Sequence, residues 1–186
     1  MGYLFGSESI LSFKSAGYAV SKAGGELTYC ANFNQSACNW LVPVDSKNKF
    51  CEACSTNHMI PDLSIPENKL DWRKIEAAKR RLFYSLHKLN LKTEYIIDGE
   101  KLKLTFDFLA PLENDPTAVT TGHDNGLITL NIKEANAAHR EYIKEQLEER
   151  YRTLLGHFRH EVGHFYWDAL IKSDPKILEE FRSHFG

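Results

Sequence analysis

The stretch His160-Glu161-Val162-Gly163-His164 decides how this chain is interpreted, because it places two histidines four residues apart inside a helical pattern. Residues at positions i and i+4 lie on one face of an α-helix, so both imidazoles can hold one zinc ion. The glutamate between them can act as general base toward a water activated by that zinc. The motif predicts a catalytic zinc site with His160 and His164 as ligands and Glu161 as the base, an arrangement typical of zinc peptidases.

The motif lies within the longest helical pattern of the chain, which predicts one helix over about residues 138–171. Apolar residues recur at helical spacing and predict its buried face: Leu147, Tyr151, Leu154, Leu155, Phe158, Val162, Phe165 and Ala169. A position deep inside such a helix argues against the alternative, a solvated helix face with two incidental histidines. After this helix, Ser173-Asp174-Pro175 predicts a break and a final helix, because an N-cap residue followed by proline is typical of a helix start.

The segments before the motif predict a small sheet and a further helix. Apolar positions at helical spacing predict an amphipathic helix over residues 71–90. Strands are expected over residues 92–97 and 101–109, on either side of the hairpin signal Asp98-Gly99. A further strand is expected over residues 127–131, where it could bind an extended substrate by strand addition. These elements predict an α+β fold with a small antiparallel sheet and a long motif helix.

Four cysteines near the N-terminus predict a second, structural zinc site. They follow the spacing C-x7-C-x12-C-x2-C, in which the last pair has the spacing of a zinc knuckle: Cys30, Cys38, Cys51 and Cys54. One alternative is that the four residues are unpaired cysteines of the core. A redox site at the last pair is a weaker alternative, because no βαβ pattern surrounds that pair. A linker containing Pro61 and Pro66 follows, so we expect a ribbon-like region over residues 1–62 and a catalytic domain over residues 63–186.

Composition narrows the class of protein and its partners. The 186 residues are 42% hydrophobic and 26% charged, as in ordinary globular domains. A formal net charge of −2 argues against a nucleic-acid partner, and no apolar run approaches the roughly 20 residues of a membrane span. The N-terminus lacks the pattern of a secretory signal, so we expect a cytoplasmic protein. The motif leads us to expect a peptide or protein substrate. The sequence does not indicate the oligomeric state.

From Tyr29 onward the chain resembles a bacterial family of zinc-binding metallopeptidases that carry an N-terminal zinc ribbon. The resemblance rests on ordered stretches along about five-sixths of the chain: residues 29–32 (YCAN), 38–43 (CNWLVP), 50–54 (FCEAC), 60–63 (IPDL), 76–82 (EAAKRRL), 121–129 (TGHDNGLIT) and 151–167 (YRTLLGHFRHEVGHFYW). It implies a ribbon fused to a zincin-like peptidase domain, with one structural and one catalytic Zn²⁺. It also implies that His160 and His164 bind the catalytic zinc and that Glu161 is the base.

The chain departs from the family pattern in two places. Ser9-Ile10-Leu11-Ser12 occupies a position where members usually carry a CxxC pair, and serine hydroxyls are poor zinc ligands. The family also continues beyond the segment that ends at Gly186, so the chain looks like a C-terminally truncated member. The resemblance therefore implies that the third zinc ligand lies further downstream. The alternative function is a catalytically inactive, zinc-binding interaction or regulatory module on the same scaffold.

The chain itself offers few candidates for that third ligand. Trp167 and Leu170 stand where the extended metzincin motif has glycine and histidine, which excludes that class. A gluzincin-like site takes a glutamate from the following helix. Three residues there could be the third ligand, although each is more simply interpreted as a solvated residue of the helix surface: Glu179, Glu180 and His184. Of the other histidines nearby, we interpret His157 as a packed or capping residue, the alternative being a residue that supports the zinc site. We interpret His123 as a surface loop residue, the alternative being a residue that faces the cleft.

Overall fold

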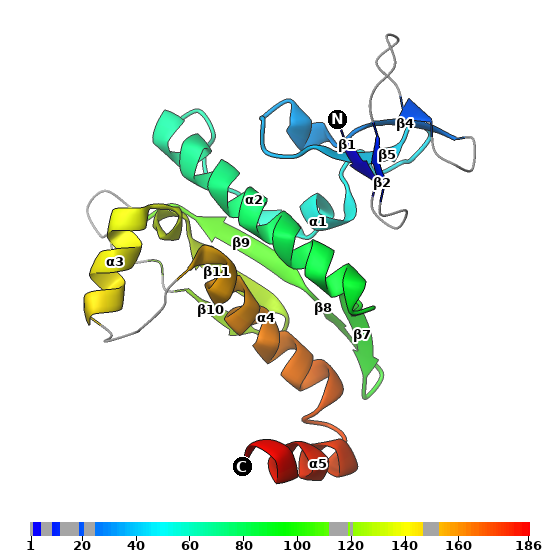
Figure 1. Ribbon diagram of the computed structural model, residues 1–186, viewed down its shortest axis with the longest axis vertical. Helices are drawn as coiled ribbons and strands as arrows, with labels where there is room; N and C mark the ends of the chain where they lie inside the picture. Colours follow the sequence, from blue (N-terminus) through cyan, green and yellow to red (C-terminus); the bar gives the residue numbers. More distant parts are fainter. Residues whose placement is uncertain are drawn as a thin grey trace.

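The structure is a computed structural model that describes residues 2–4, 9–11, 19–20, 25–111, 119, 121–146 and 153–186. Helices and small sheets alternate along it, which confirms a mixed α and β architecture (Figure 1). The expected apolar residues Leu147 and Tyr151, and Ser12 of the altered CxxC position, lie outside the described residues. None of the described helices is both long and apolar enough to cross a lipid bilayer.

The N-terminal unit is built on a five-stranded sheet of order β2-β1-β5-β4-β3. Its strands are short: β1 (Gly2–Leu4), β2 (Ser9–Leu11), β3 (Ala19–Val20), β4 (Glu26–Tyr29) and β5 (Trp40–Pro43). Strands β4 and β5 pair antiparallel and are joined through the 3₁₀ helix η1 (Ala31–Phe33). The four-residue helix α1 (Glu52–Ser55) ends the unit.

The second sheet has four strands in the order β10-β11-β9-β6 and is mixed. The strands are β6 (Asn57–Met59), β9 (Thr105–Leu109), β10 (Gly122–Asp124) and β11 (Leu127–Asn131). Strand β9 pairs parallel with both β6 and β11, and only the β10–β11 pair is antiparallel. The expected antiparallel sheet is therefore wrong. A parallel pair needs a long crossover, and the chain between β6 and β9 contains helix α2 (Pro66–Lys88).

A two-stranded hairpin forms where Asp98-Gly99 predicted it. Strands β7 (Glu94–Ile97) and β8 (Glu100–Lys103) are joined by these two residues, which have φ angles of 52° and 83°. Two consecutive residues with positive φ are the mark of a type I′ turn, in which glycine is favoured at the second position. The expected strand over residues 101–109 is split at Leu104, which is fully buried between β8 and β9.

The single long helix expected before residue 171 is wrong, because the chain forms two helices there. These are α3 (Ala137–Gln146) and α4 (Leu154–Leu170), which carries the motif. Thr153 has an extended backbone, and its side-chain oxygen accepts a hydrogen bond from the Gly156 amide, which starts a new helix. Helix α5 (Pro175–Phe185) follows with Asp174 as its N-cap, as predicted.

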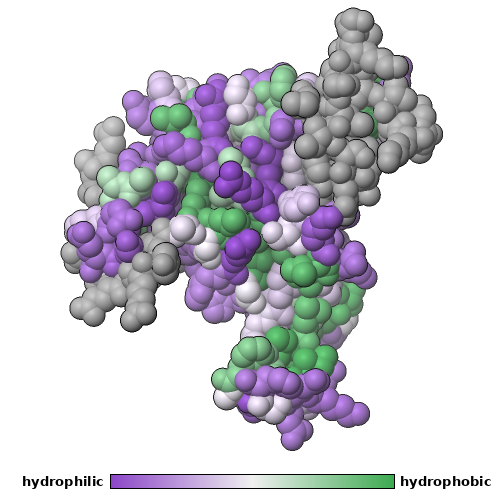
Figure 2. Space-filling model, viewed as in Figure 1, coloured by the Kyte–Doolittle hydropathy of each residue, from purple (hydrophilic) through white to green (hydrophobic). Residues whose placement is uncertain are grey.

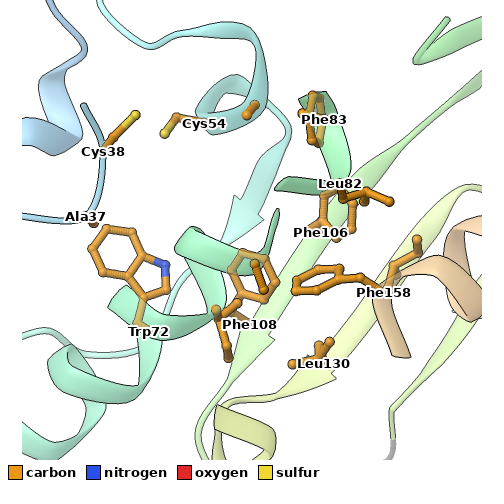
Figure 3. Packing of buried hydrophobic residues seen from close by; sticks show 14 of the residues in the cluster. Ala37, Cys38, Cys54, Trp72, Leu82, Phe83, Phe106, Phe108, Leu130 and Phe158 are labelled. Carbon is orange, nitrogen blue, oxygen red and sulfur yellow. The ribbon is translucent and has the colours of Figure 1, made fainter. Parts of the chain in front are cut away.

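The core lies where helices α2 and α4 cover the second sheet. Figure 3 shows Phe158 of α4 directed at Phe106 and Phe108 of β9, and Leu82 of α2 beside them. Phe158 meets the other two rings edge-on, at centroid distances of 5.7 and 6.2 Å. Full burial of such a ring contributes about 2–3 kcal/mol. This packing fixes the rotation of α4 and hence the direction in which the motif faces.

A buried ion pair on α2 joins the two units of the fold. Lys79 and Glu76 have no solvent exposure, and Nζ of Lys79 lies 3.0 Å from Oε1 of Glu76. The other carboxylate oxygen of Glu76 lies 3.8 Å from the thiol of Cys54 in the N-terminal unit. Asn57, in the first strand of the second sheet, donates to Glu76 at 2.8 Å and contacts Lys79. The pair thus links the last cysteine to the sheet.

The opposite end of the molecule is more open. Helix α5 projects away from the body in Figure 1, and apolar surface continues toward it in Figure 2. Trp167 of α4 packs edge-on against Phe181 of α5, with ring centroids 5.0 Å apart. Ile177 and Phe185 of α5 are exposed. This helix contributes no buried residue to the core.

Candidate metal centres

The four cysteines come together at one point of the N-terminal unit. Their sulfur atoms lie within 4.8 Å of one another, and all four residues are buried and free of disulfides. Sγ of Cys38 and Sγ of Cys51 are 3.7 Å apart. Two thiolates bound tetrahedrally at about 2.3 Å from one zinc lie about 3.8 Å apart. The sulfur cluster therefore fits a structural zinc ion.

Backbone amides support the same cluster. The amide of Cys51 donates to Sγ of Cys30 at 3.3 Å, and the amide of Trp40 donates to Sγ of Cys38 at 3.4 Å. Hydrogen bonds from Cys38, and then from Cys51 and Cys54, lower the pKa of the Cys30 thiol, and the Cys51 amide lowers it further. The same hydrogen bonds to Cys30 raise the pKa of Cys51 and Cys54, so within the cluster it is Cys30 that is held as thiolate, the form that binds zinc.

The two motif histidines meet on the exposed side of α4. Nε2 of His160 and Nε2 of His164 are 3.3 Å apart, and the two rings are almost perpendicular. Two imidazole nitrogens bound tetrahedrally at 2.0–2.1 Å from one zinc lie about 3.3–3.4 Å apart. Both residues are exposed, so an ion held between them would be open to solvent and to a substrate. The spacing fits a zinc ion with open coordination positions.

Glu161, which lies between these two histidines in the sequence, contacts a third histidine of α4. It is buried, and its Oε1 lies 3.2 Å from Nε2 of His157, one turn earlier on α4. The hydrogen bond from His157 lowers the pKa of the Glu161 carboxyl, so that this group is ionised at neutral pH. Nδ1 of His157 lies 3.6 Å from Oε2 of Glu134, which is buried in the 3₁₀ helix η2 (Ile132–Ala135). His157 therefore lies between two buried carboxylates.

This chain of contacts was missed by the sequence interpretation. The spacing of His157 and Glu161, four residues apart on one helix, was a usable signal for their contact. Glu134 gave no such signal, because only the tertiary fold brings η2 against α4. The interpretation of His157 as a merely packed or capping residue is incomplete, since its ring contacts the motif glutamate directly.

His123 also belongs to this surface, contrary to its interpretation as a surface loop residue. It lies on β10, and its ring stacks parallel to that of His164 with centroids 6.0 Å apart. Burial is the main cause that lowers its pKa, so the ring is neutral at pH 7. Nε2 of His123 accepts a hydrogen bond from the Gly126 amide at 3.0 Å, which places the ring proton on Nδ1. That nitrogen is a donor and not a metal ligand.

The sheet edge beside the motif differs from the expected one. Strand β11, expected to bind substrate by strand addition, lies inside the sheet between β10 and β9. Among the described strands, β10 and β6 are at the two edges of this sheet, and β10 contacts α4. An extended peptide that adds to this sheet next to the motif would therefore pair with β10.

No third ligand joins the two histidines within the described residues. Among them, the four cysteines are the only group of three or more potential ligands within reach of one ion. Glu179, Glu180 and His184 are exposed on α5, and the ring of His184 is engaged by the Glu180 carbonyl at 2.8 Å. In the described part of the chain, these three candidates do not complete the site.

Comparisons with known proteins find two family matches and three similar proteins. Residues 1–65 match a family described as a zinc-ribbon domain, and residues 68–186 match one described as "Putative zinc-binding metallo-peptidase". An uncharacterized protein of Mycobacterium bovis and two of Mycobacterium tuberculosis are each 38% identical over 161 residues, which is 87% of this chain and 46% of theirs. The chain thus spans about half the length of these relatives. No solved structure matches the chain.

The second of these family matches covers most of the chain and includes all but the first two residues of α2, strands β9, β10 and β11, α4 and the motif. The first covers the unit that holds the sulfur cluster. With its zinc-ribbon unit at the N-terminus, the chain belongs to the family of putative zinc-binding metallo-peptidases.

Proposed function

We propose that the protein is a zinc-dependent peptidase that hydrolyses peptide bonds in peptide or protein substrates. In this proposal His160 and His164 hold the catalytic zinc, Glu161 is the general base, and the four cysteines hold a structural zinc. The observation that carries the proposal is the 3.3 Å separation of the two Nε2 atoms, which suits one zinc ion. The membership of the chain in a family of zinc-binding metallopeptidases supports the same conclusion.

The residues around the motif have separate tasks in the proposed reaction. A zinc ion bound there would polarise the substrate carbonyl and make water more acidic. Glu161 would accept the proton of the attacking water and pass it to the leaving amine. His157 would hold the Glu161 carboxylate in place and ionised, because its Nε2 lies 3.2 Å from Oε1. The protonated Nδ1 of His123 would offer a donor beside His164.

The proposal is tested by zinc content and hydrolysis measured on the same samples. We expect Glu161→Gln to keep its zinc and to lose nearly all hydrolysis of fluorescently labelled casein. His160→Ala should lose one zinc, and Cys51→Ser should lose the other. Glu179→Gln removes an exposed carboxylate on α5 and serves as the matched control, with unchanged zinc and turnover. Undiminished hydrolysis by Glu161→Gln would refute the assignment of the base.

One observation favours a second candidate, a zinc-binding interaction module without catalysis. A catalytic zinc takes three protein ligands, and among the described residues no third potential ligand lies within reach of His160 and His164. Elemental analysis separates the two candidates. One zinc per chain, lost with Cys51→Ser and kept with His160→Ala, together with no hydrolysis, supports the interaction module.

A further inference from the structure

An open groove lies between helix α2, helix α4 and strand β5 of the ribbon unit. Its volume is about 570 Å³, within the range of sites that bind ligands. The floor is apolar and includes Leu155 of α4 and Tyr84 of α2, with Trp40 of β5 at the ribbon side. The proposed catalytic reaction uses none of these residues.

Three arginines line this groove, and among the described residues no carboxylate lines it. They are Arg80 and Arg81 on α2 and Arg159 on α4. The whole chain has a formal net charge of −2, so this concentration of positive charge runs against its overall balance. The guanidinium group stays charged at every physiological pH and matches a carboxylate or phosphate with two parallel hydrogen bonds.

Two of the three guanidinium groups are available to a ligand. Arg80 is fixed by a hydrogen bond from its Nη1 to the backbone carbonyl of Ala37, which ties α2 to the ribbon unit. Arg81 and Arg159 are exposed, and neither forms an ion pair within the part of the chain that the structure describes. The groove is therefore lined by two exposed, unneutralised guanidinium groups, one from α2 and one from α4.

The groove lies on a different flank of α4 from the zinc motif. Leu155 and Arg159 are four residues apart and face α2. His164 faces the other way, toward His123 on β10. A ligand in the groove would thus leave the histidine pair uncovered, and binding there can be measured apart from any hydrolysis.

We infer that this groove is a docking site for an acidic, extended peptide segment. The axes of packed helices are about 8–10 Å apart. Side chains two or three residues apart in an extended chain are separated by about 7–10 Å. Two acidic side chains two residues apart lie on one face of such a chain and can meet Arg81 and Arg159 at once. The openness of the groove and its two cationic walls favour a peptide over a single small phosphate.

The test is a binding measurement on the full chain with Glu161→Gln as background, so that no turnover disturbs it. The probe is a fluorescein-labelled peptide in which glutamate and leucine alternate, and its matched control has glutamine in place of glutamate. We expect the glutamate peptide to bind about tenfold more tightly, since it forms ion pairs with both Arg81 and Arg159. Arg81→Ala and Arg159→Ala should each weaken binding about two- to fivefold.

The control variant is Arg182→Ala, which removes an exposed arginine on α5 far from the groove in sequence and should leave binding unchanged. Zinc content and melting temperature show that each variant is folded. Equal binding of the two peptides, or binding that ignores both groove arginines, would overturn the inference. Inorganic phosphate that binds in an Arg81- and Arg159-dependent manner, with no peptide binding, would overturn it in favour of a small-anion site.

Discussion

Replacement of Lys79 by methionine should destabilise the protein far more than most single substitutions. Lys79 and Glu76 are both fully buried, 3.0 Å apart, and the ammonium group lies over the rings of Phe106 and Phe108 at 5.4 and 5.0 Å. Lys79→Met keeps the apolar stem but leaves the Glu76 carboxylate without its counter-charge. Removal of one partner of a buried pair costs about 3–5 kcal/mol. For a chain of 186 residues this corresponds to a fall in melting temperature of roughly 6–20 °C.

Urea unfolding at constant zinc, followed by circular dichroism, measures this loss. The double variant Lys79→Met/Glu76→Leu removes both charges and should recover most of the stability, because the penalty arises from the unpaired charge. Lys74→Met is the control. Lys74 also pairs with a carboxylate, that of Asp71, but its side chain is 45% exposed, so its loss should cost at most about 1 kcal/mol. If Lys79→Met costs less than about 1 kcal/mol, or the double variant is as unstable as the sum of its parts, the reasoning fails.

Three further predictions concern the zinc sites and the motif helix. In His157→Phe the pKa of Glu161 should rise, because the hydrogen bond from His157 to Glu161 is lost. The acid limb of the pH–rate profile should therefore move to higher pH, and an unmoved limb would contradict the contact between the two side chains. Gly163→Ala should stabilise the protein by about 1 kcal/mol in urea unfolding, since a Cβ there meets open space. Gly156→Ala should bring no gain in stability, because its Cβ would lie 2.9 Å from the hydroxyl of the N-cap residue Thr153. Cys51→Ser should lower the melting temperature and abolish its dependence on added chelator; an unchanged melting temperature would argue against a structural zinc.

The elements that sequence predicted well are those specified by neighbouring residues. The turn at Asp98-Gly99 needs two residues with positive φ, and strand β11 occupies the predicted residues 127–131. Helix α5 begins after the predicted N-cap Asp174. In each case the signal and the structure lie within the same few residues, so no tertiary contact was needed to interpret them.

The features that sequence did not predict depend on distant contacts. The parallel pairing of β9 with β6 joins segments separated by the whole of α2, and alternating hydrophobicity does not distinguish it from antiparallel pairing. The break before α4 was hidden because the apolar spacing continues through Thr153, whose extended backbone and capping hydrogen bond begin a new helix. The same holds at the candidate site, where Glu134 and His123 reach α4 from other parts of the chain.

The short connection from Cys54 to strand β6 has a practical consequence for domain exchange. Only Ser55 and Thr56 separate the last cysteine from Asn57, the first residue of a strand that pairs with β9. A fragment that ends at residue 62 would carry β6 away with the ribbon and leave β9 as an unprotected edge, which favours aggregation. The ribbon is therefore not a transplantable cassette with a boundary in the proline-rich linker, and any chimera should be joined between Cys54 and Asn57.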